Sequence, residues 1–323
     1  MCLLMTTGRT GSDYLQACLD GVDGVMTFCG KFDYQKFFTG PDEKVEKEKL
    51  IDLFLKEYHY LFSYYEHEDI DTEVNTKVLK ENFLKITSSS SINRKEFLLN
   101  IYKAYHLTLN RNIETIKVLV HHTHNPKASK EFLKDFPDSK MLITIRDPRA
   151  NLKSGMVNHF DYNSKTKSMH HVLFYIRRIR EDLKFALNKK NRKLFVKLEE
   201  ANDYETKIKI VKFLEVNYDK NIMISTIASK IWNGDKLSKN RRKDGGYNQS
   251  AKNNQWSDFF TSNDKLLLNL LFKDYKIFGY NFIDLSWKQK IQLFFLVFFR
   301  MSFEKWIFKS LNTGFWLKIV NYK

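Results

Sequence analysis

The chain has 323 residues, of which 43% are hydrophobic and 15% aromatic, so it can bury a substantial core and is not intrinsically disordered. Its 12 glycines and 4 prolines are too few for a collagen-like chain or for an all-β fold with many turns. A formal net charge of +16 indicates anionic partners, namely nucleic acid, a membrane surface or phosphate-bearing small molecules.

The three cysteines, Cys2, Cys18 and Cys29, all lie in the first tenth of the chain, where they can form no disulfide framework and match no zinc-ligand spacing. This usage is typical of a reducing compartment. No segment has the pattern of a signal peptide, and the longest apolar run, 293–299, is far shorter than the ~20 residues that a membrane-spanning helix needs. We therefore expect a cytoplasmic protein, peripheral to the inner face of a membrane at most.

Strand-like and helix-like segments alternate along most of the chain. A first strand is expected at 2–7, followed by a glycine turn and a helix that begins near Asp13. An insertion at about 35–112 is predominantly helical in pattern, and the alternation then resumes. The later elements expected are a strand at 116–120, a helix at 129–136, a strand at 140–145, a helix at 166–190, a strand at 193–198, a helix at 204–216 and a polar basic loop at 233–255.

Two helices are predicted within the insertion. Residues 42–66 place apolar side chains at helical spacing, and a second helix is expected to begin at the serine run 88–91, as its N-cap, and to continue through Leu109. The insertion is also rich in tyrosine and histidine. These side chains suit either stacking on sugars and aromatic rings or packing in a helical face.

Short strands that alternate with helices predict an α/β fold, with a central parallel sheet flanked by helices. No interdomain linker or internal repeat is visible, so we expect one domain over 1–282, followed by a helical tail at 283–323. In the tail, aromatic and aliphatic residues alternate with lysine and arginine. Such a segment either lies on an anionic membrane surface or packs on the domain or in a dimer contact.

Segment 6–13 has the composition of a phosphate-binding loop between a strand and a helix. Glycines let the backbone approach an anion, and the following helix presents free N–H groups and the positive end of its dipole. The loop is not that of a nucleotide triphosphatase, because GxxxxGK[ST] would need glycine, lysine and serine or threonine where Thr6, Ser12 and Asp13 stand. An ordinary strand-to-helix turn is the alternative interpretation. The residues expected to contact phosphate are Gly8, Arg9, Thr10, Gly11, Ser12 and Asp13.

A second signal follows the strand at 140–145, which delivers Arg146 to its carboxyl end, where ligands bind in open α/β sheets. Pro148 then stands near the start of a helix whose Ser154 can turn back towards the same place. In isolation, this motif favours a surface turn in which Arg146 forms a salt bridge.

Taken together, the two segments resemble those of sulfotransferases that use 3′-phosphoadenylyl sulfate (PAPS). Those enzymes bind the 5′-phosphosulfate with a [KR]-[ST]-G-[ST] loop, which residues 9–12 match here. They bind the 3′-phosphate with a strand that ends in R-[DN]-P and with a serine eight positions after the arginine, which Arg146 and Ser154 match. Cytosolic members also carry K-[TS]-H-x-P, whose histidine is the base, matched by 122–126 with His124 in that position.

Weaker matches extend this resemblance over 1–30 and 116–282. They comprise a YEDL…FL-like segment at 197–201 and 211–214, an RKG…W…FT-like close at 241–246, 256 and 259–261, and a GY pair at 279–280. Three departures stand out: Arg9 replaces a frequent lysine, Asp13 a frequent threonine, and His122 the lysine two positions before the base.

The resemblance implies a P-loop-like sulfotransferase fold and assigns roles to individual residues. Arg9 is the cation for the bridging oxygen and His124 the catalytic base, with His121 and His122 as alternatives in the same segment. No metal is implied, because the cations come from the protein. The other donor-binding residues expected are Arg146 and Ser154 at the 3′-phosphate, Arg242 and Lys243 from the basic loop, and Tyr14 stacked on adenine or merely packed.

The implied activity is transfer of a sulfuryl group from PAPS to an acceptor hydroxyl, which leaves adenosine 3′,5′-bisphosphate. A carbohydrate or glycolipid is the expected acceptor, and a small alcohol or phenol is the alternative. A P-loop kinase is the rival enzyme, and the missing GK[ST] counts against it. The alternative outside the enzymes is a basic nucleic-acid-binding protein, but the chain carries no recognisable motif for nucleic-acid recognition.

Overall fold

The computed structural model describes residues 1–62, 74–158, 169–234, 247, 256–260 and 262–298. The chain divides into two compact units. The first unit combines 1–6, 11–144 and 189–249, and the second combines 7–10, 145–188 and 250–323. Of the predicted site residues, Arg242 and Lys243 lie outside the described residues.

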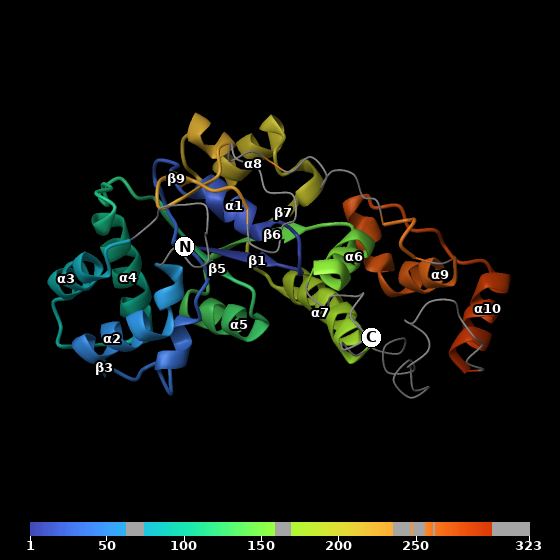
Figure 1. Ribbon diagram of the computed structural model, residues 1–323, viewed down its shortest axis with the longest axis horizontal. Helices are drawn as coiled ribbons and strands as arrows, with labels where there is room; N and C mark the ends of the chain where they lie inside the picture. Colours follow the sequence, from blue (N-terminus) through green and yellow to red (C-terminus); the bar gives the residue numbers. More distant parts are fainter. Residues whose placement is uncertain (63–73, 159–168, 235–246, 248–255, 261, 299–323) are drawn as a thin grey trace. The chain divides into compact units, whose positions relative to one another are not determined.

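A sheet of five strands in the order β2-β5-β1-β6-β7 forms the centre of the first unit (Figure 1). β1 pairs in parallel with both β5 and β6, and β2 pairs in parallel with β5. All residues of β1 and of β5 are buried, as expected for parallel strands covered on both faces. The predicted α/β class with a central parallel sheet is therefore confirmed. The strands are β1 (Cys2–Thr6), β2 (Val25–Met26), β5 (Val118–Thr123), β6 (Lys140–Ile145) and β7 (Lys193–Lys197).

Helices cover this sheet, and Figure 1 shows α1 and α5 on opposite sides of it. α1 (Ser12–Leu19) contacts β1, α5 (Pro126–Asp135) contacts β1 and β5, and α8 (Tyr204–Leu214) contacts β7. α5 begins three residues before the predicted start, because Asn125 caps it by accepting from the backbone N–H of Lys127 and a proline occupies its first turn.

The insertion is helical but more divided than predicted. α2 (Lys47–Glu57) is shorter than the helix expected at 42–66, because β3 (Val45–Glu46) pairs antiparallel with β4 (Ser91–Ile92) just before it. α3 (Thr76–Ile86) was not predicted. The next helix, α4 (Arg94–Thr108), is capped by a reciprocal box of Asn93 and Glu96 rather than by the serine run.

Aromatic side chains form the core of the insertion. Phe28 packs against Phe54 and Tyr102 with ring centroids 6.1 and 5.2 Å apart, and all three side chains are buried. Tyr58 is buried too, and its hydroxyl accepts from the backbone N–H of Asp33 at 2.8 Å. Of the tyrosines whose role the composition left open, Tyr58 and Tyr102 therefore pack in the core.

The second unit is built from helices in its described part. α6 contacts α7, and α9 contacts α10. α7 lies within the helix expected at 166–190, and α10 opens the predicted helical tail. None of the helices among the described residues has both the length and the apolar character needed to cross a membrane. The helices are α6 (Pro148–Asn158), α7 (Met169–Asn188), α9 (Ser262–Leu271) and α10 (Trp287–Phe298).

Short elements complete the described chain. They are the 3₁₀ turns η1 (Tyr34–Phe37), η2 (His59–Leu61), η3 (Leu198–Glu200), η4 (Lys220–Met223) and η6 (Lys273–Phe278), and the antiparallel pair β8 (Thr226–Ile227) and β9 (Lys230–Ile231).

Candidate active site

Two glycines shape the loop between β1 and α1. Gly8 has φ +111° and Gly11, the N-cap residue of α1, has φ +78°, a region in which other residues are strained. A Cβ on Gly8 would lie 2.7 Å from the hydroxyl of Tyr175, and one on Gly11 would lie 2.3 Å from Cδ1 of Leu198. Both positions therefore require glycine for conformation and for space.

Arg9 belongs to a hydrogen-bond network with four residues of its own unit, which we call the Arg9 clamp: Thr7, Asn151, Ser154 and Tyr175. Its backbone N–H donates to Oδ1 of Asn151 at 2.9 Å and to the hydroxyl of Tyr175 at 3.0 Å. Asn151 in turn donates to the carbonyl of Thr7 at 2.7 Å and accepts from the Tyr175 hydroxyl at 2.8 Å. Nε of Arg9 donates to Oγ of Ser154 at 3.0 Å. The clamp thus fixes both the backbone and the guanidinium of Arg9.

The start of α6 explains why the chain folds this way after β6. Asp147 accepts from the backbone N–H of Arg149 at 2.9 Å and from its Nε and Nη2 at 3.0 and 2.7 Å. The Arg149 guanidinium also lies 4.0 Å from the ring centroid of Trp256 and 4.2 Å from that of Phe282. Arg149 is therefore a buried structural cation, whereas Arg146, half-buried directly after β6, is the motif's candidate for ligand binding.

β5 continues past the predicted strand at 116–120 and includes His121 and His122. His121 is buried in the core, where its ring stacks on Phe132 with centroids 5.2 Å apart and its Nδ1 lies 3.1 Å from the hydroxyl of Tyr102. Burial lowers the pKa of His121 to about 3. This histidine is neutral at physiological pH and belongs to the packing.

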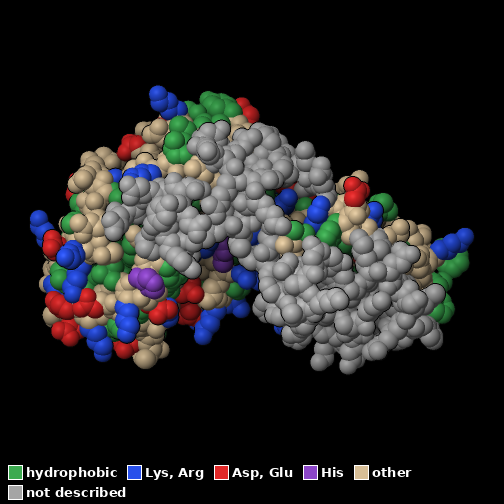
Figure 2. Space-filling model, in the orientation of Figure 1, with side chains coloured by type: hydrophobic (Ala, Val, Ile, Leu, Met, Phe, Trp, Pro, Cys, Tyr) green, Lys and Arg blue, Asp and Glu red, His purple; other side chains and the backbone are tan. Residues whose placement is uncertain are grey.

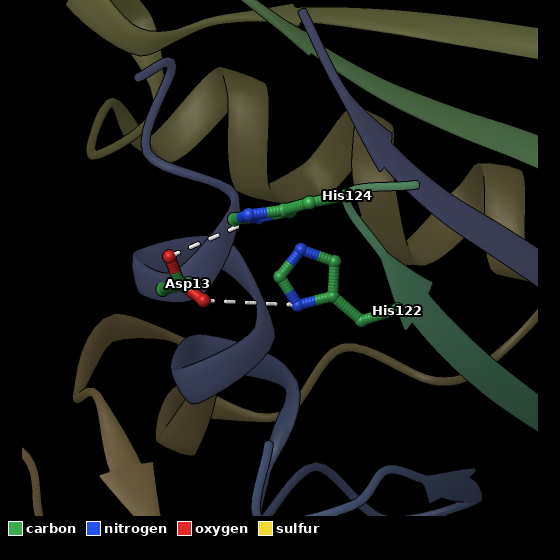
Figure 3. Close-up of side chains that lie close together, drawn as sticks. All are labelled: Asp13, His122 and His124. Carbon is green, nitrogen blue, oxygen red and sulfur yellow. Dashed lines mark ion pairs between the residues drawn. The ribbon is translucent and has the colours of Figure 1, made fainter. Parts of the chain in front are cut away.

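His122 and His124 project to one place together with Asp13, as expected from strand alternation, and we call these three residues the Asp13 cluster (Figure 3). The two imidazole rings have centroids 4.8 Å apart. Asp13 lies 3.9 Å from Nδ1 of His122 and 3.9 Å from Nε2 of His124. Oγ of Ser12 is 2.9 Å from the same Nε2 of His124. The first turn of α1 and the end of β5 thus build one cluster of titratable groups.

Gln16 sets the tautomer of His122. Its amide nitrogen donates to the carbonyls of Phe28 at 2.8 Å and Gly30 at 3.3 Å, so its oxygen is left to accept from Nδ1 of His122 at 2.6 Å. The proton of His122 is therefore on Nδ1, and Nε2 carries a lone pair. This Nε2 is buried, has no hydrogen-bond partner among the described residues, and lies on the side of the ring that faces His124 (Figure 3). Burial holds the pKa of His122 well below its usual range.

Asp13 is a charged member of the cluster. Burial opposes its ionisation, but the Lys31 ammonium 2.5 Å away and the neighbouring His124 hold the pKa of this carboxyl well below its usual range. The ligand atoms of the cluster lie within 4.8 Å of one another, a spacing that a metal ion also requires. The ammonium of Lys31, already paired with Asp13, opposes a second cation at this carboxylate.

Exposure separates the three histidines that the sequence left as alternatives for the base. The side chain of His122 is 0% exposed and that of His124 is 33% exposed, while His121 is buried in the core. A base must come within hydrogen-bond distance of the proton that it removes. Among the three, His124 is the histidine whose side chain is accessible to solvent.

Tyr14 is packed inside the first unit. Its hydroxyl donates to Oδ1 of Asn202 at 2.7 Å, and its ring meets Tyr247 edge-on with centroids 5.3 Å apart. The ammonium of Lys207, a fully buried residue, lies 4.9 Å from the Tyr14 ring centroid. These contacts account for the aromatic at this position through packing, and stacking on adenine stays a prediction.

The sequence reading missed Asn151, Tyr175, Gln16 and Lys31, which orient the candidate ligands. The sequence does carry a signal for Asn151, because this residue stands three positions before Ser154 and helical spacing places both on one face of α6. The others join segments that are far apart in sequence and carry no local signal.

No protein-family model matches the chain, and neither does any curated protein. Among solved structures, the sulfotransferase domain from the Synechococcus PCC 7002 olefin synthase aligns with a TM-score of 0.52 at 14% identity, covering 88% of this chain and 95% of that one. The sulfotransferase domain from the curacin biosynthetic pathway aligns with a TM-score of 0.49 at 11% identity, covering 91% and 96%. Sulfotransferase STF9 from Mycobacterium avium aligns with a TM-score of 0.36 at 14% identity, covering 68% and 65%. The first of these likenesses shows that the fold is that of a sulfotransferase domain, as the sequence motifs implied.

Proposed function

We propose that this protein transfers a sulfuryl group from PAPS to an acceptor hydroxyl. One observation carries the proposal: in a sulfotransferase fold, the guanidinium of Arg9 donates to the hydroxyl of Ser154. These two residues come from separate motifs, and each was assigned to the phosphates of the donor on its own motif. Their contact brings the two motifs side by side, so that both can reach one bound donor molecule.

The donor is held by fixed positive charge and backbone N–H groups. Arg9 and Arg146 supply guanidinium cations, which stay charged at all physiological pH values and pair bidentately with phosphate. In the first unit, the first turn of α1 also suits an anion, because its N-cap residue is Gly11 and no side chain of the described residues caps it. Its N–H groups and the positive end of the helix dipole favour an anion there.

The reaction needs little covalent work from the protein. The acceptor oxygen forms a bond to sulfur while the bond from sulfur to the bridging oxygen breaks, and the electron pair of that bond goes to the leaving 5′-phosphate. Arg9 stabilises the charge that develops on the bridging oxygen. No metal is needed for this step, because the guanidinium supplies the charge.

His124 takes the proton that the acceptor hydroxyl loses. The ionised Asp13, 3.9 Å from Nε2, stabilises the imidazolium that forms. Ser12, whose Oγ lies 2.9 Å from the same nitrogen, orients the ring before the acceptor arrives. The unprotonated Nε2 of His122 places a second lone pair beside His124.

We infer an acceptor hydroxyl on a carbohydrate or glycolipid, with a small alcohol or phenol as the alternative. The support is the insertion, which precedes the base in the chain and is rich in tyrosine and histidine. His59 is exposed and Tyr60 half-buried in its described part, whereas Tyr58 is buried.

Nucleotide-induced thermal stabilisation tests the donor. Adenosine 3′,5′-bisphosphate at 100 times its dissociation constant should stabilise the protein by about 2.7 kcal/mol, whereas ATP with Mg²⁺ should give no shift. A shift with ATP and Mg²⁺ alone would instead indicate a kinase. Labelled PAPS offered with glycolipids, oligosaccharides and simple phenols then identifies the acceptor class by which product carries the label.

A further inference from the structure

One face of α10 is apolar and exposed to solvent. Trp287 is 67% exposed, Ile291 45%, Phe294 55% and Phe295 46%. At about 100° per residue these positions form one stripe along the helix, with an arc of about 100°. We call it the α10 stripe.

The opposite side of α10 is attached to its own unit. Leu293 is buried, and the amide of Gln292 donates to Oδ1 of Asn263, next to the start of α9, at 2.9 Å. The helix also has a defined start, because Ser286 and Gln289 cap it reciprocally. The stripe is thus exposed on a helix that is anchored by its other face.

Lysines border the stripe on both sides. On the helical wheel, Lys288 and Lys290 fall beyond its two edges, and both are exposed. Figure 2 shows hydrophobic side chains over α10 at the right of the view with lysine or arginine beside them. The sequence from 283 to 323 adds Arg300, Lys305, Lys309, Lys318 and Lys323 against two acidic residues, Asp284 and Glu304. An apolar stripe with cationic borders is complementary to an anionic lipid surface, in which acyl chains lie beneath charged headgroups.

We propose that α10 binds the surface of an anionic membrane, with the α10 stripe in the headgroup layer and its lysines on the lipid phosphates. The helix lies in the interface and does not cross it, since its 12 residues are fewer than the ~20 that a span requires. This proposal does not depend on sulfuryl transfer, and binding and turnover can fail separately.

Vesicle flotation of the full chain tests it. Vesicles with about 30% phosphatidylglycerol in phosphatidylcholine should carry the protein at low salt, and pure phosphatidylcholine or high salt should carry much less. Replacing Trp287, Ile291 and Phe294 by serine should weaken binding about 100-fold. The matched control replaces three residues of similar exposure outside α10 by serine, Leu53, Tyr218 and Ile224, and should bind as the wild type does.

Charge is tested on the same vesicles. Lys288→Gln with Lys290→Gln should weaken binding about 25-fold, since each lysine near an anionic surface contributes about fivefold. The control, Lys77→Gln with Lys95→Gln, removes two exposed lysines elsewhere and should have no effect. Equal losses in both pairs would show that only net charge matters and would overturn the proposal.

A labelling experiment distinguishes lipid on the α10 stripe from two other possible binding partners, the chain's own segment after 298 and a second copy of the chain. The native cysteines are all buried, so Phe294→Cys introduces an exposed thiol that a maleimide should label rapidly. Anionic vesicles should then slow labelling about tenfold or more. Slow labelling without vesicles would show that protein covers the stripe and would overturn the proposal; sedimentation then tells a dimer from a monomer.

Discussion

The Arg9 clamp of the second unit and the Asp13 cluster of the first unit are built from different chemistry. The clamp places an arginine, whose charge does not change with pH, in a set of neutral hydrogen-bond partners, Asn151, Ser154 and Tyr175. The cluster places two imidazoles beside an ionised carboxylate that Lys31 keeps charged. The clamp is suited to holding an anion, and the cluster is suited to moving a proton.

The largest effect is expected at the exposed histidine of the cluster. His124→Ala should lower turnover by about two to four orders of magnitude, because the acceptor loses its base, while the dissociation constant of adenosine 3′,5′-bisphosphate stays within about twofold. Steady-state kinetics and nucleotide titration measure the two quantities. Lys130→Ala, at an exposed lysine of α5, is the control and should change neither. A larger loss of turnover in His122→Ala than in His124→Ala would mean that His122 is the base.

The next effect concerns charge at the end of β6. Arg146→Ala should weaken binding of adenosine 3′,5′-bisphosphate about 10- to 100-fold, because a charge-assisted contact to the 3′-phosphate is lost. Adenosine 5′-phosphosulfate lacks that phosphate, so its binding should change less. Titration calorimetry with both nucleotides checks this, with Arg177→Ala, at an exposed arginine of α7, as control. Equal losses for the two nucleotides would contradict the assignment of Arg146.

Acid should destabilise the first unit through the histidines of β5. His121 has a pKa of about 3 in the folded protein against about 6.5 in the unfolded chain, so the unfolded chain binds a proton that the folded protein does not. The contribution of His121 to the free energy of unfolding is therefore complete above pH 6.5 and decreases as the pH falls. At pH 5 the loss is about 2 kcal/mol. In His121→Phe, urea unfolding should show a correspondingly smaller difference between pH 7 and pH 5, and Tyr102 keeps its bond to the carbonyl of Val120. An unchanged difference would show that His121 does not titrate as a buried histidine.

The smallest effect is expected in the clamp. Tyr175→Phe removes an acceptor of the Arg9 N–H and a donor to Asn151, at a cost of about 1 kcal/mol in the free energy of unfolding. The affinity for adenosine 3′,5′-bisphosphate should fall severalfold, with no change in the pH dependence of stability, because no titratable group of the cluster is touched. Tyr204→Phe, at an exposed tyrosine, should leave both unchanged. If Tyr175→Phe leaves the affinity unchanged, the clamp does not position Arg9 for the donor.

Much of the fold follows from local patterns. The strands at 2–6, 140–145 and 193–197 are short apolar runs with clear ends, and the loop at 6–13 shows its glycines directly. The insertion was harder, because a brief pairing of β3 with β4 places the start of α2 at Lys47, and Asn93 rather than a serine caps α4. Both features depend on which neighbouring segments pair, and helical periodicity alone does not report this.

The candidate site divides in the same way. The resemblance of short motifs to a known family was enough to single out Arg9, Arg146, Ser154 and His124 as candidates, because the residue types of a phosphate loop and of a base stand within a few positions of a strand end. Tertiary folding alone brought Lys31 to Asp13, Gln16 to His122, and Asn151 and Tyr175 to Arg9. Protonation states, tautomers and side-chain directions are set by these partners, and Asn151 and Tyr175 lie more than a hundred residues from Arg9 along the chain. Short-range pattern encodes backbone conformation, whereas the charge and orientation of a buried group depend on which distant side chains pack around it.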